Sequence, residues 1–124
     1  MNRLLLAQGV YYLVTGLWAL VSLSTFELVT GPKVDDWLVQ TVGALLLAIG
    51  ASLVIGARRA KPAPETLVLA GGTALAFIAI ELTFVLNGRI SPIYLADTAV
   101  ELVFLGGALW AGLRSFRSAT GTGR

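Results

Sequence analysis

The chain has 124 residues, of which 56% are hydrophobic and only 13% are charged, and its mean hydropathy is +0.83. A soluble domain contains about a quarter charged residues, so this chain has too few to cover a water-facing surface. It contains no cysteine and no histidine, which excludes disulfides, Cys-ligated metals and the commonest general base, and we expect no cofactor and no metal.

Four apolar segments predict an all-α integral membrane bundle of four transmembrane helices, because each approaches the roughly 20 residues that a bilayer span needs. The first helix is expected over residues 4–24, before the helix-stopping pair Gly31-Pro32. A cleaved signal peptide is the alternative for this segment. We favour a retained helix because the apolar run is long and carries Tyr11, Tyr12 and Trp18.

The second and third helices are expected over residues 37–57 and 66–86. Asp35 or Asp36 is suited to cap the second helix at its N-terminus. Between these two helices, the stretch "RRAKPAPE" (58–65) holds three cations and two prolines, so it must lie outside the hydrocarbon.

The fourth helix is expected over residues 92–114, after a turn at Asn87-Gly88, with Ser91 as N-cap and Pro92 in the first helical position. The short connection predicts a tight antiparallel hairpin of helices 3 and 4. Residues 1–114 then form one transmembrane domain, and residues 115–124 are expected to be a disordered cytoplasmic tail.

The positions of Lys and Arg predict the orientation in the cytoplasmic membrane. Seven of the nine would share one side of the membrane, and only Lys33 and Arg89 would lie on the other. Since basic loops stay in the cytoplasm, both termini are expected there. The net charge of +2 is therefore explained by membrane boundaries, and no nucleic-acid partner is expected.

Polar side chains recur at spacings of three and four residues, which places them on one face of each expected helix. Such faces turn inward in a membrane bundle, because lipid cannot satisfy their hydrogen bonds. Most lie in the expected outer half, whereas the inner half is rich in Ala, Gly and Leu. We therefore expect a closely packed inner half below an acidic pocket that opens outward. Its expected ligand-binding residues are Glu101, Glu81, Asp97, Gln40, Tyr94, Thr98, Thr15 and Trp18.

Asp97 and Glu101 lie one helical turn apart in an apolar segment. At 1.5 Å per residue, Asp97 lies about 8 Å and Glu101 about 13 Å beyond Pro92, in a hydrocarbon core about 30 Å thick. A charged side chain near the midplane costs on the order of 3 kcal/mol or more. Burial and mutual repulsion both favour protonation of at least one of the two carboxyl groups.

Two interpretations of the three intramembrane acids remain open. In the functional one, the carboxyl groups bind a cation, protons or the polar head of a ligand, with Trp18 as an apolar wall. In the structural one, the acids are satisfied inside the protein. The partners would then be Arg89 or Lys33 for Glu81 or Asp97, and Gln40 or Thr15 for Glu101.

The stretches "TGPKVDDWLVQTVG" (30–43) and "ISPIYLADTAVE" (90–101) resemble recurring segments of small four-helix bacterial membrane proteins without assigned function. In architecture alone, the chain is similar to small multidrug-resistance transporters, whose essential glutamate lies in the first helix; the first helix here has no acid. It is also similar to the sterol-isomerase and sigma-2-receptor superfamily. That resemblance implies an acid-lined pocket for amphiphilic cations or sterols.

Three functions follow as hypotheses. The first is binding, with or without transport, of a small amphiphilic or cationic molecule. The second is a membrane enzyme that acts on a lipid or isoprenoid by carboxylate acid–base chemistry, although no soluble-enzyme motif is present and no catalytic residue is assigned. The third is a non-catalytic assembly subunit, and a homodimer is compatible with all three. The close-packing face for assembly would be Ala44, Ala48, Ser52 and Gly56.

Overall fold

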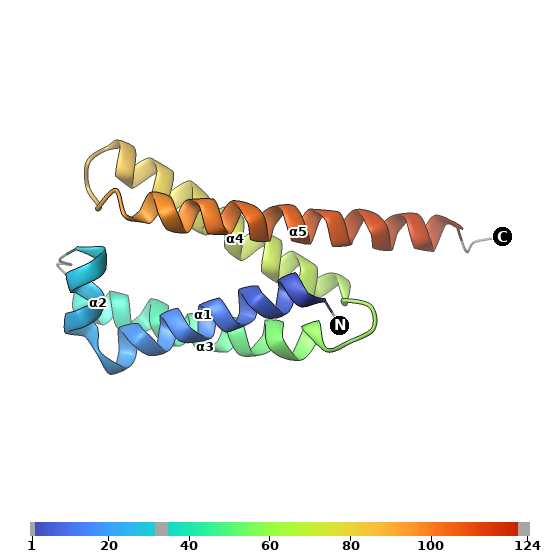
Figure 1. Ribbon diagram of the computed structural model, residues 1–124, viewed down its shortest axis with the longest axis horizontal. Helices are drawn as coiled ribbons and strands as arrows, with labels where there is room; N and C mark the ends of the chain where they lie inside the picture. The colour runs from blue at the N-terminus through green and yellow to red at the C-terminus, as the bar shows by residue number, and fades with distance from the viewer. Residues whose placement is uncertain (1, 32–34, 122–124) are drawn as a thin grey trace.

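The computed structural model describes residues 2–31 and 35–121, with side chains described through residue 117. Its helices are α1 (Arg3–Val21), α2 (Leu23–Thr30), α3 (Asp36–Ala57), α4 (Pro64–Leu86) and α5 (Tyr94–Gly121) (Figure 1). All regular structure in these ranges is helical. By length and composition, α1, α3, α4 and the Tyr94–Arg117 part of α5 could each cross a membrane. The prediction of an all-α chain with four long apolar helices is confirmed.

The first expected helix is interrupted at Ser22, and the short helix α2 was not predicted. Ser22 leaves the helical conformation, with φ −140° and ψ 70°. The Thr25 hydroxyl lies within hydrogen-bonding distance of the Ser22 carbonyl and hydroxyl oxygens. Serine and threonine compete in this way for the hydrogen bonds of a helix. The chain therefore turns here. α2 ends at Thr30, and its C-cap is Gly31, whose φ of 98° is accessible mainly to glycine.

The turn before α5 is the expected one, whereas α5 extends further at its C-terminal end than expected. The turn at Asn87-Gly88 is present, with φ 72° at Gly88. α5 begins at Tyr94 rather than at residue 92 and continues to Gly121. Residues 115–121, expected to be disordered, are therefore helical, because no glycine or proline stops the helix before Gly121. Residues 122–124 of the expected tail lie outside the described residues.

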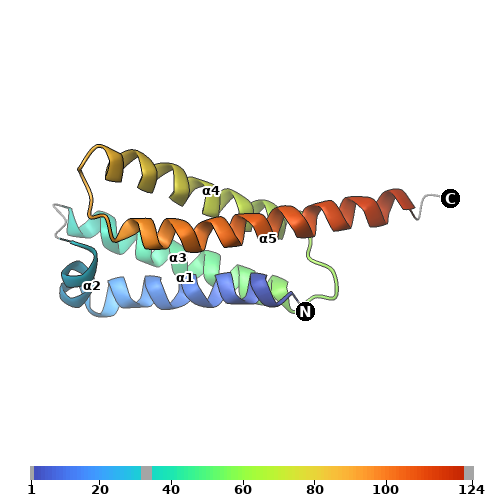
Figure 2. The same cartoon turned by 45° about the horizontal axis from the view of Figure 1, so that its top comes forward.

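The four long helices form two antiparallel pairs. α1 packs along α3 and α4 along α5, whereas contacts between the pairs are much fewer (Figures 1 and 2). Glycines allow the α1–α3 approach: Gly9 faces Gly50 and Gly16 faces Gly43, seven residues apart on each helix. A Cβ atom added to Gly50 would lie 2.7 Å from the carbonyl oxygen of Gly9. The two backbones are therefore in direct contact at these two levels.

The two pairs join at the end of the bundle that carries the N-terminus. There the Gln8 side-chain amide of α1 donates to the Ala70 carbonyl oxygen of α4 at 2.9 Å, and Gly56 of α3 lies against Thr66 of α4. Toward the opposite end, which carries α2 and is called the α2 end below, α4 diverges from α3 (Figures 1 and 2). The resulting wedge between the pairs contains the candidate site.

Candidate functional site

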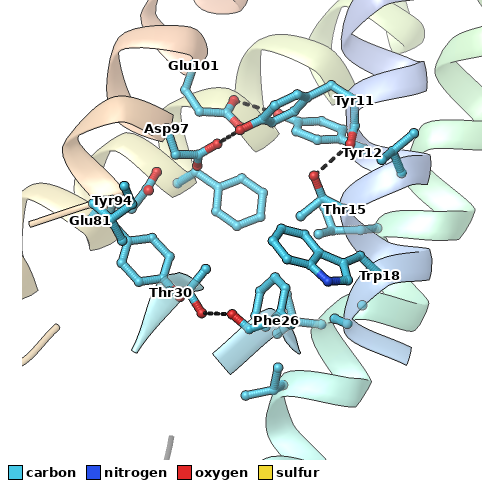
Figure 3. Close-up of a pocket in the computed structure, with 18 of the residues that line it drawn as sticks. Tyr11, Tyr12, Thr15, Trp18, Phe26, Thr30, Glu81, Tyr94, Asp97 and Glu101 are labelled. Carbon is cyan, nitrogen blue, oxygen red and sulfur yellow. Dashed lines mark hydrogen bonds between the residues drawn. The ribbon is translucent and has the colours of Figure 1, made fainter. Parts of the chain in front are cut away.

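A cavity of about 590 Å³ lies between the two helix pairs on the side of the α2 end (Figure 3). Helices α1, α4 and α5 contribute its ionisable side chains, whereas α3 contributes only apolar residues. Aromatic side chains form much of the remaining wall. They are Tyr11, Tyr12, Trp18, Phe26, Phe77 and Tyr94. The cavity is therefore more apolar than the sequence predicted, and its polar groups are concentrated in one place.

That place is the acidic cluster, which consists of Glu81 on α4 with Asp97 and Glu101 on α5. Asp97 and Glu101 share a face of α5 because they are four residues apart. The antiparallel neighbour α4 brings Glu81 to the same face. Glu81 and Glu101 are buried, with 3% and 1% of their surfaces exposed. Three carboxyl groups from two helices thus converge at one wall of the cavity (Figure 3).

Two tyrosines of α1 provide hydrogen bonds to this cluster from the other helix pair. The Tyr11 hydroxyl donates to Asp97 Oδ1, and the Tyr12 hydroxyl donates to Glu101 Oε2 at 2.6 Å. Gln8 Nε2 donates in turn to the Tyr12 hydroxyl oxygen at 3.1 Å. The Gln8–Tyr12–Glu101 part of this network is buried, with Tyr12 1% exposed, whereas the Tyr11–Asp97 bond is partly buried. A phenol that donates to a carboxylate in an apolar interior holds the two helix pairs together across the cavity.

The acidic cluster retains capacity for a further partner. Neither carboxyl oxygen of Glu81 accepts a hydrogen bond from the described residues, and neither does Oε1 of Glu101. The Glu81 carboxyl group lies beside that of Asp97, and two such groups can hydrogen-bond only when one carries a proton. Among the described residues, the charged groups that act on Glu81 are the other two carboxyl groups, with no Lys or Arg. A buried acceptor without a donor costs about 1–3 kcal/mol, which favours a ligand that supplies one.

Helix α2 covers the end of the cavity. Phe26, 8% exposed, packs edge-on against Trp18 with ring centroids 5.2 Å apart. The Trp18 indole N–H donates to the Thr25 hydroxyl oxygen at 2.9 Å. These contacts fix α2 on α1 and place two aromatic rings at the wall opposite the acidic cluster (Figure 3).

The structure brings most of the sequence-predicted site residues together. Six of the eight line the one cavity, namely Thr15, Trp18, Glu81, Tyr94, Asp97 and Glu101. Thr98 is buried but does not line the cavity, because its hydroxyl donates to the Tyr94 carbonyl oxygen one turn earlier. Gln40 is exposed and does not line the cavity. It lies in the second turn of α3, where its amide can be solvated near the helix end.

The expected structural partners of the acids are also corrected. Glu101 is bonded by Tyr12, not by Gln40 or Thr15, and the Thr15 hydroxyl donates to the Tyr11 carbonyl oxygen. Arg89 is exposed and is not among the charged groups that act on Glu81. Lys33 lies outside the described residues.

The small-residue face expected for assembly is only partly exposed. Ala44, Ala48 and Ser52 are exposed on α3, whereas Gly56 is buried inside the chain against Thr66.

Sequence reasoning missed Gln8, Tyr11 and Tyr12 as members of the site. A signal was present, because Tyr11 and Tyr12 lie near the middle of an apolar segment, too deep for an aromatic belt at the membrane surface. A buried phenol usually has a hydrogen-bond partner, and the acids of the fourth expected helix were the available acceptors.

No protein family, curated protein or solved structure matches the chain. None of these comparisons supports the resemblances given above, and the function is argued from the site. In the part of the chain that the structure describes, no group of three or more acidic, histidine or cysteine side chains is arranged to hold a metal ion.

Proposed function

We propose that this chain is a multi-pass protein of the cytoplasmic membrane, with both termini in the cytoplasm, that binds a small amphiphilic molecule carrying a positive charge. The observation that carries the proposal is the acidic cluster at one wall of an apolar cavity, with three buried carboxyl oxygens that accept no hydrogen bond from the described residues. Four helices of transmembrane length and composition support the membrane location, and the distribution of Lys and Arg supports the orientation.

The charge of the ligand follows from the groups around the cavity. Among the residues that the structure describes, its lining contains three carboxyl groups and no Lys or Arg, so an anion would be repelled by these groups. A cationic head would neutralise the cluster and lie near the Tyr94 ring, which lines the cavity beside Glu81 (Figure 3), and aromatic faces attract cations. The described residues offer no metal-ion arrangement, and the apolar walls favour an organic cation with a hydrophobic body.

Binding can be measured with octyltrimethylammonium as the cationic probe and octanol as its neutral counterpart. The protein is placed in lipid nanodiscs, and Trp18 fluorescence is followed in a Trp37→Phe, Trp110→Phe background. Both replaced residues are about two-thirds exposed, at 66% and 64%, and neither lines the cavity. We expect the cation to bind saturably and octanol to bind far more weakly.

Isosteric variants of the acids test the role of charge. A charge-assisted interaction contributes about 1.5–3 kcal/mol, so Glu81→Gln and Asp97→Asn should each weaken cation binding about tenfold or more. Asp36→Asn is the matched control, because Asp36 is an exposed acid outside the cavity. Equal binding of cation and alcohol by the parent protein, or unaltered cation binding by both variants, would refute the proposal.

A second candidate function is acid–base chemistry on a lipid or isoprenoid. The side-by-side carboxyl groups of Glu81 and Asp97, next to an apolar cavity, favour it, because two acids held together can differ in protonation and act as acid and base. Lipids that co-purify with the protein should then change in structure on incubation, as followed by NMR and chromatography, and the change should cease in Glu81→Gln and in Asp97→Asn. If a broad lipid panel shows no turnover, this candidate is wrong.

A further inference from the structure

The cavity reaches the side of the bundle as well as its end. Several lining residues are themselves exposed, among them Val14 of α1 at 61% and Ile93 before α5 at 47%. On α3, Leu38 and Val42 line the cavity and are 44% and 45% exposed. A side chain that both lines a cavity and lies on the surface marks a place where the cavity opens. Leu38 and Val42 face α4, whose contribution to the lining is Phe77 and Glu81. We call the opening between these four residues the α3–α4 slot.

Helical geometry explains why the slot is open. Leu38 and Gly56 are about five turns apart on α3, so they lie on the same face of the helix. At the Gly56 level this face is covered by Thr66 of α4, which a Cβ on Gly56 would approach to 2.7 Å. At the Leu38 level the same face is exposed, because α4 has diverged from α3 (Figure 1). The slot is therefore a consequence of the divergence of the two helix pairs.

The surfaces around the slot match hydrocarbon rather than water. Leu38, Val42 and Phe77 are apolar, and Glu81, the polar member, is 3% exposed and directed to the acidic cluster. In a membrane-spanning bundle, exposed apolar residues on the side of α3 contact lipid chains. A polar solute has no favourable path through such an opening, whereas a hydrocarbon chain does.

The size of the cavity limits what it can enclose. At about 30 Å³ per non-hydrogen atom, taken from the volume of a water molecule in the liquid, a cavity of about 590 Å³ holds roughly twenty such atoms. A cationic head with a short chain fits inside. A longer chain can be accommodated only if it extends through an opening, and the α3–α4 slot leads to the hydrocarbon.

Resting on the proposed function, we infer that the ligand is a single-chain membrane amphiphile with an ammonium head, which enters from the bilayer through the α3–α4 slot. Its head lies at the acidic cluster, and its chain passes between Val42 and Phe77 into the surrounding lipid. The structure thus assigns the two ends of the ligand to different places. The acidic cluster selects the charge, and the slot removes an upper limit on chain length.

The test compares octyltrimethylammonium with docosyltrimethylammonium, whose chain alone exceeds the roughly twenty atoms that the cavity holds, in the nanodisc assay described above. The parent protein should bind the docosyl probe at least as tightly as the octyl probe. Val42→Trp, which places a bulky side chain in the slot, should lower the ratio of docosyl to octyl affinity at least tenfold. Leu38→Trp is a second variant at the same opening and should lower the same ratio.

Ile55→Trp is the matched control, because Ile55 is a 68% exposed residue of α3 that does not line the cavity, and it should leave the ratio unchanged. If the parent protein binds the octyl probe but excludes the docosyl probe, or if both slot variants keep the parental ratio, the lateral slot is wrong while the binding site stands. If the octyl probe itself does not bind, the proposed function fails.

Discussion

The glycine contacts between α1 and α3 allow a prediction whose magnitude follows from the structure. In Gly50→Ala, the new Cβ would lie 2.7 Å from the Gly9 carbonyl oxygen and 2.9 Å from the Leu13 nitrogen. Both are backbone atoms, so no side chain can rotate to make room. Ordinary contact begins at 3.4 Å, so the two helices would have to separate by about 0.7 Å. Overpacking of this kind costs about 1–3 kcal/mol.

Gly72→Ala provides the matched control, because a Cβ on Gly72 would have no atom within 4 Å. Both variants gain the same helix propensity, about 1 kcal/mol, so the difference between them isolates the steric cost. We expect Gly50→Ala to unfold with about 1–3 kcal/mol less free energy than Gly72→Ala. The measurement is SDS titration in mixed micelles, followed by circular dichroism and tryptophan fluorescence. Equal stability of the two variants would refute the close contact between α1 and α3.

Three further predictions concern the acidic cluster and the topology. Tyr12→Phe removes the hydroxyl that donates to Glu101 at 2.6 Å, and it should lower the unfolding free energy by about 1–3 kcal/mol. Thr41→Val removes an exposed hydroxyl bonded only within its own helix, so an equal loss there would contradict the importance of the buried bond. The affinity for octyltrimethylammonium should decrease as the pH is lowered, because protonation removes the negative charge of the acidic cluster while the charge of the probe is fixed. Binding isotherms across a pH series check this prediction. An affinity that increases in acid would contradict it. Because the chain has no cysteine, single introduced cysteines report the orientation of the loops. Arg89→Cys should react with a membrane-impermeant maleimide in intact spheroplasts, whereas Arg59→Cys should react only after permeabilisation. The reverse pattern would show that the proposed orientation is wrong.

The acids of the site could be predicted from sequence because carboxyl groups are rare within segments apolar enough to cross a membrane. A carboxyl group such as Glu101, far from either end of an apolar segment, has few places to lie other than the inside of a bundle. The periodicity of the polar residues then indicates which face of each helix points inward. For this reason Glu81, Asp97 and Glu101 were placed together before any geometry was known.

The partners of these acids could not be predicted, because they depend on how α1 is rotated against α5. The Gly9–Gly50 and Gly16–Gly43 contacts fix α1 on α3, and this rotation directs Tyr11 and Tyr12 toward the acids. The prediction that Gln40 lines the cavity is wrong for the same reason. The face of α3 that packs against α1 is the one that carries Gly43, and Gln40 is exposed.

Helix α2 was missed because the segment is short and its boundary depends on side-chain competition at Ser22 rather than on hydrophobic periodicity. Apolar content alone extends the first helix through this region. The extra length of α5 was missed for a related reason. The polar composition of residues 115–121 suggested disorder, but a helix continues until a residue such as glycine or proline stops it.

The pairing of helices also has a consequence for the synthesis of the chain. All three acids belong to the second pair, α4–α5, whereas the tyrosines that bond to them belong to the first, α1–α3. The first pair is complete once residue 57 has been translated, and its backbone contacts involve none of the later residues. If the chain enters the membrane as proposed, the second hairpin does so with its carboxyl groups still lacking their phenol donors. Lateral association of the two hairpins supplies those donors, so the residues that form the site also provide a driving force for the last step of assembly.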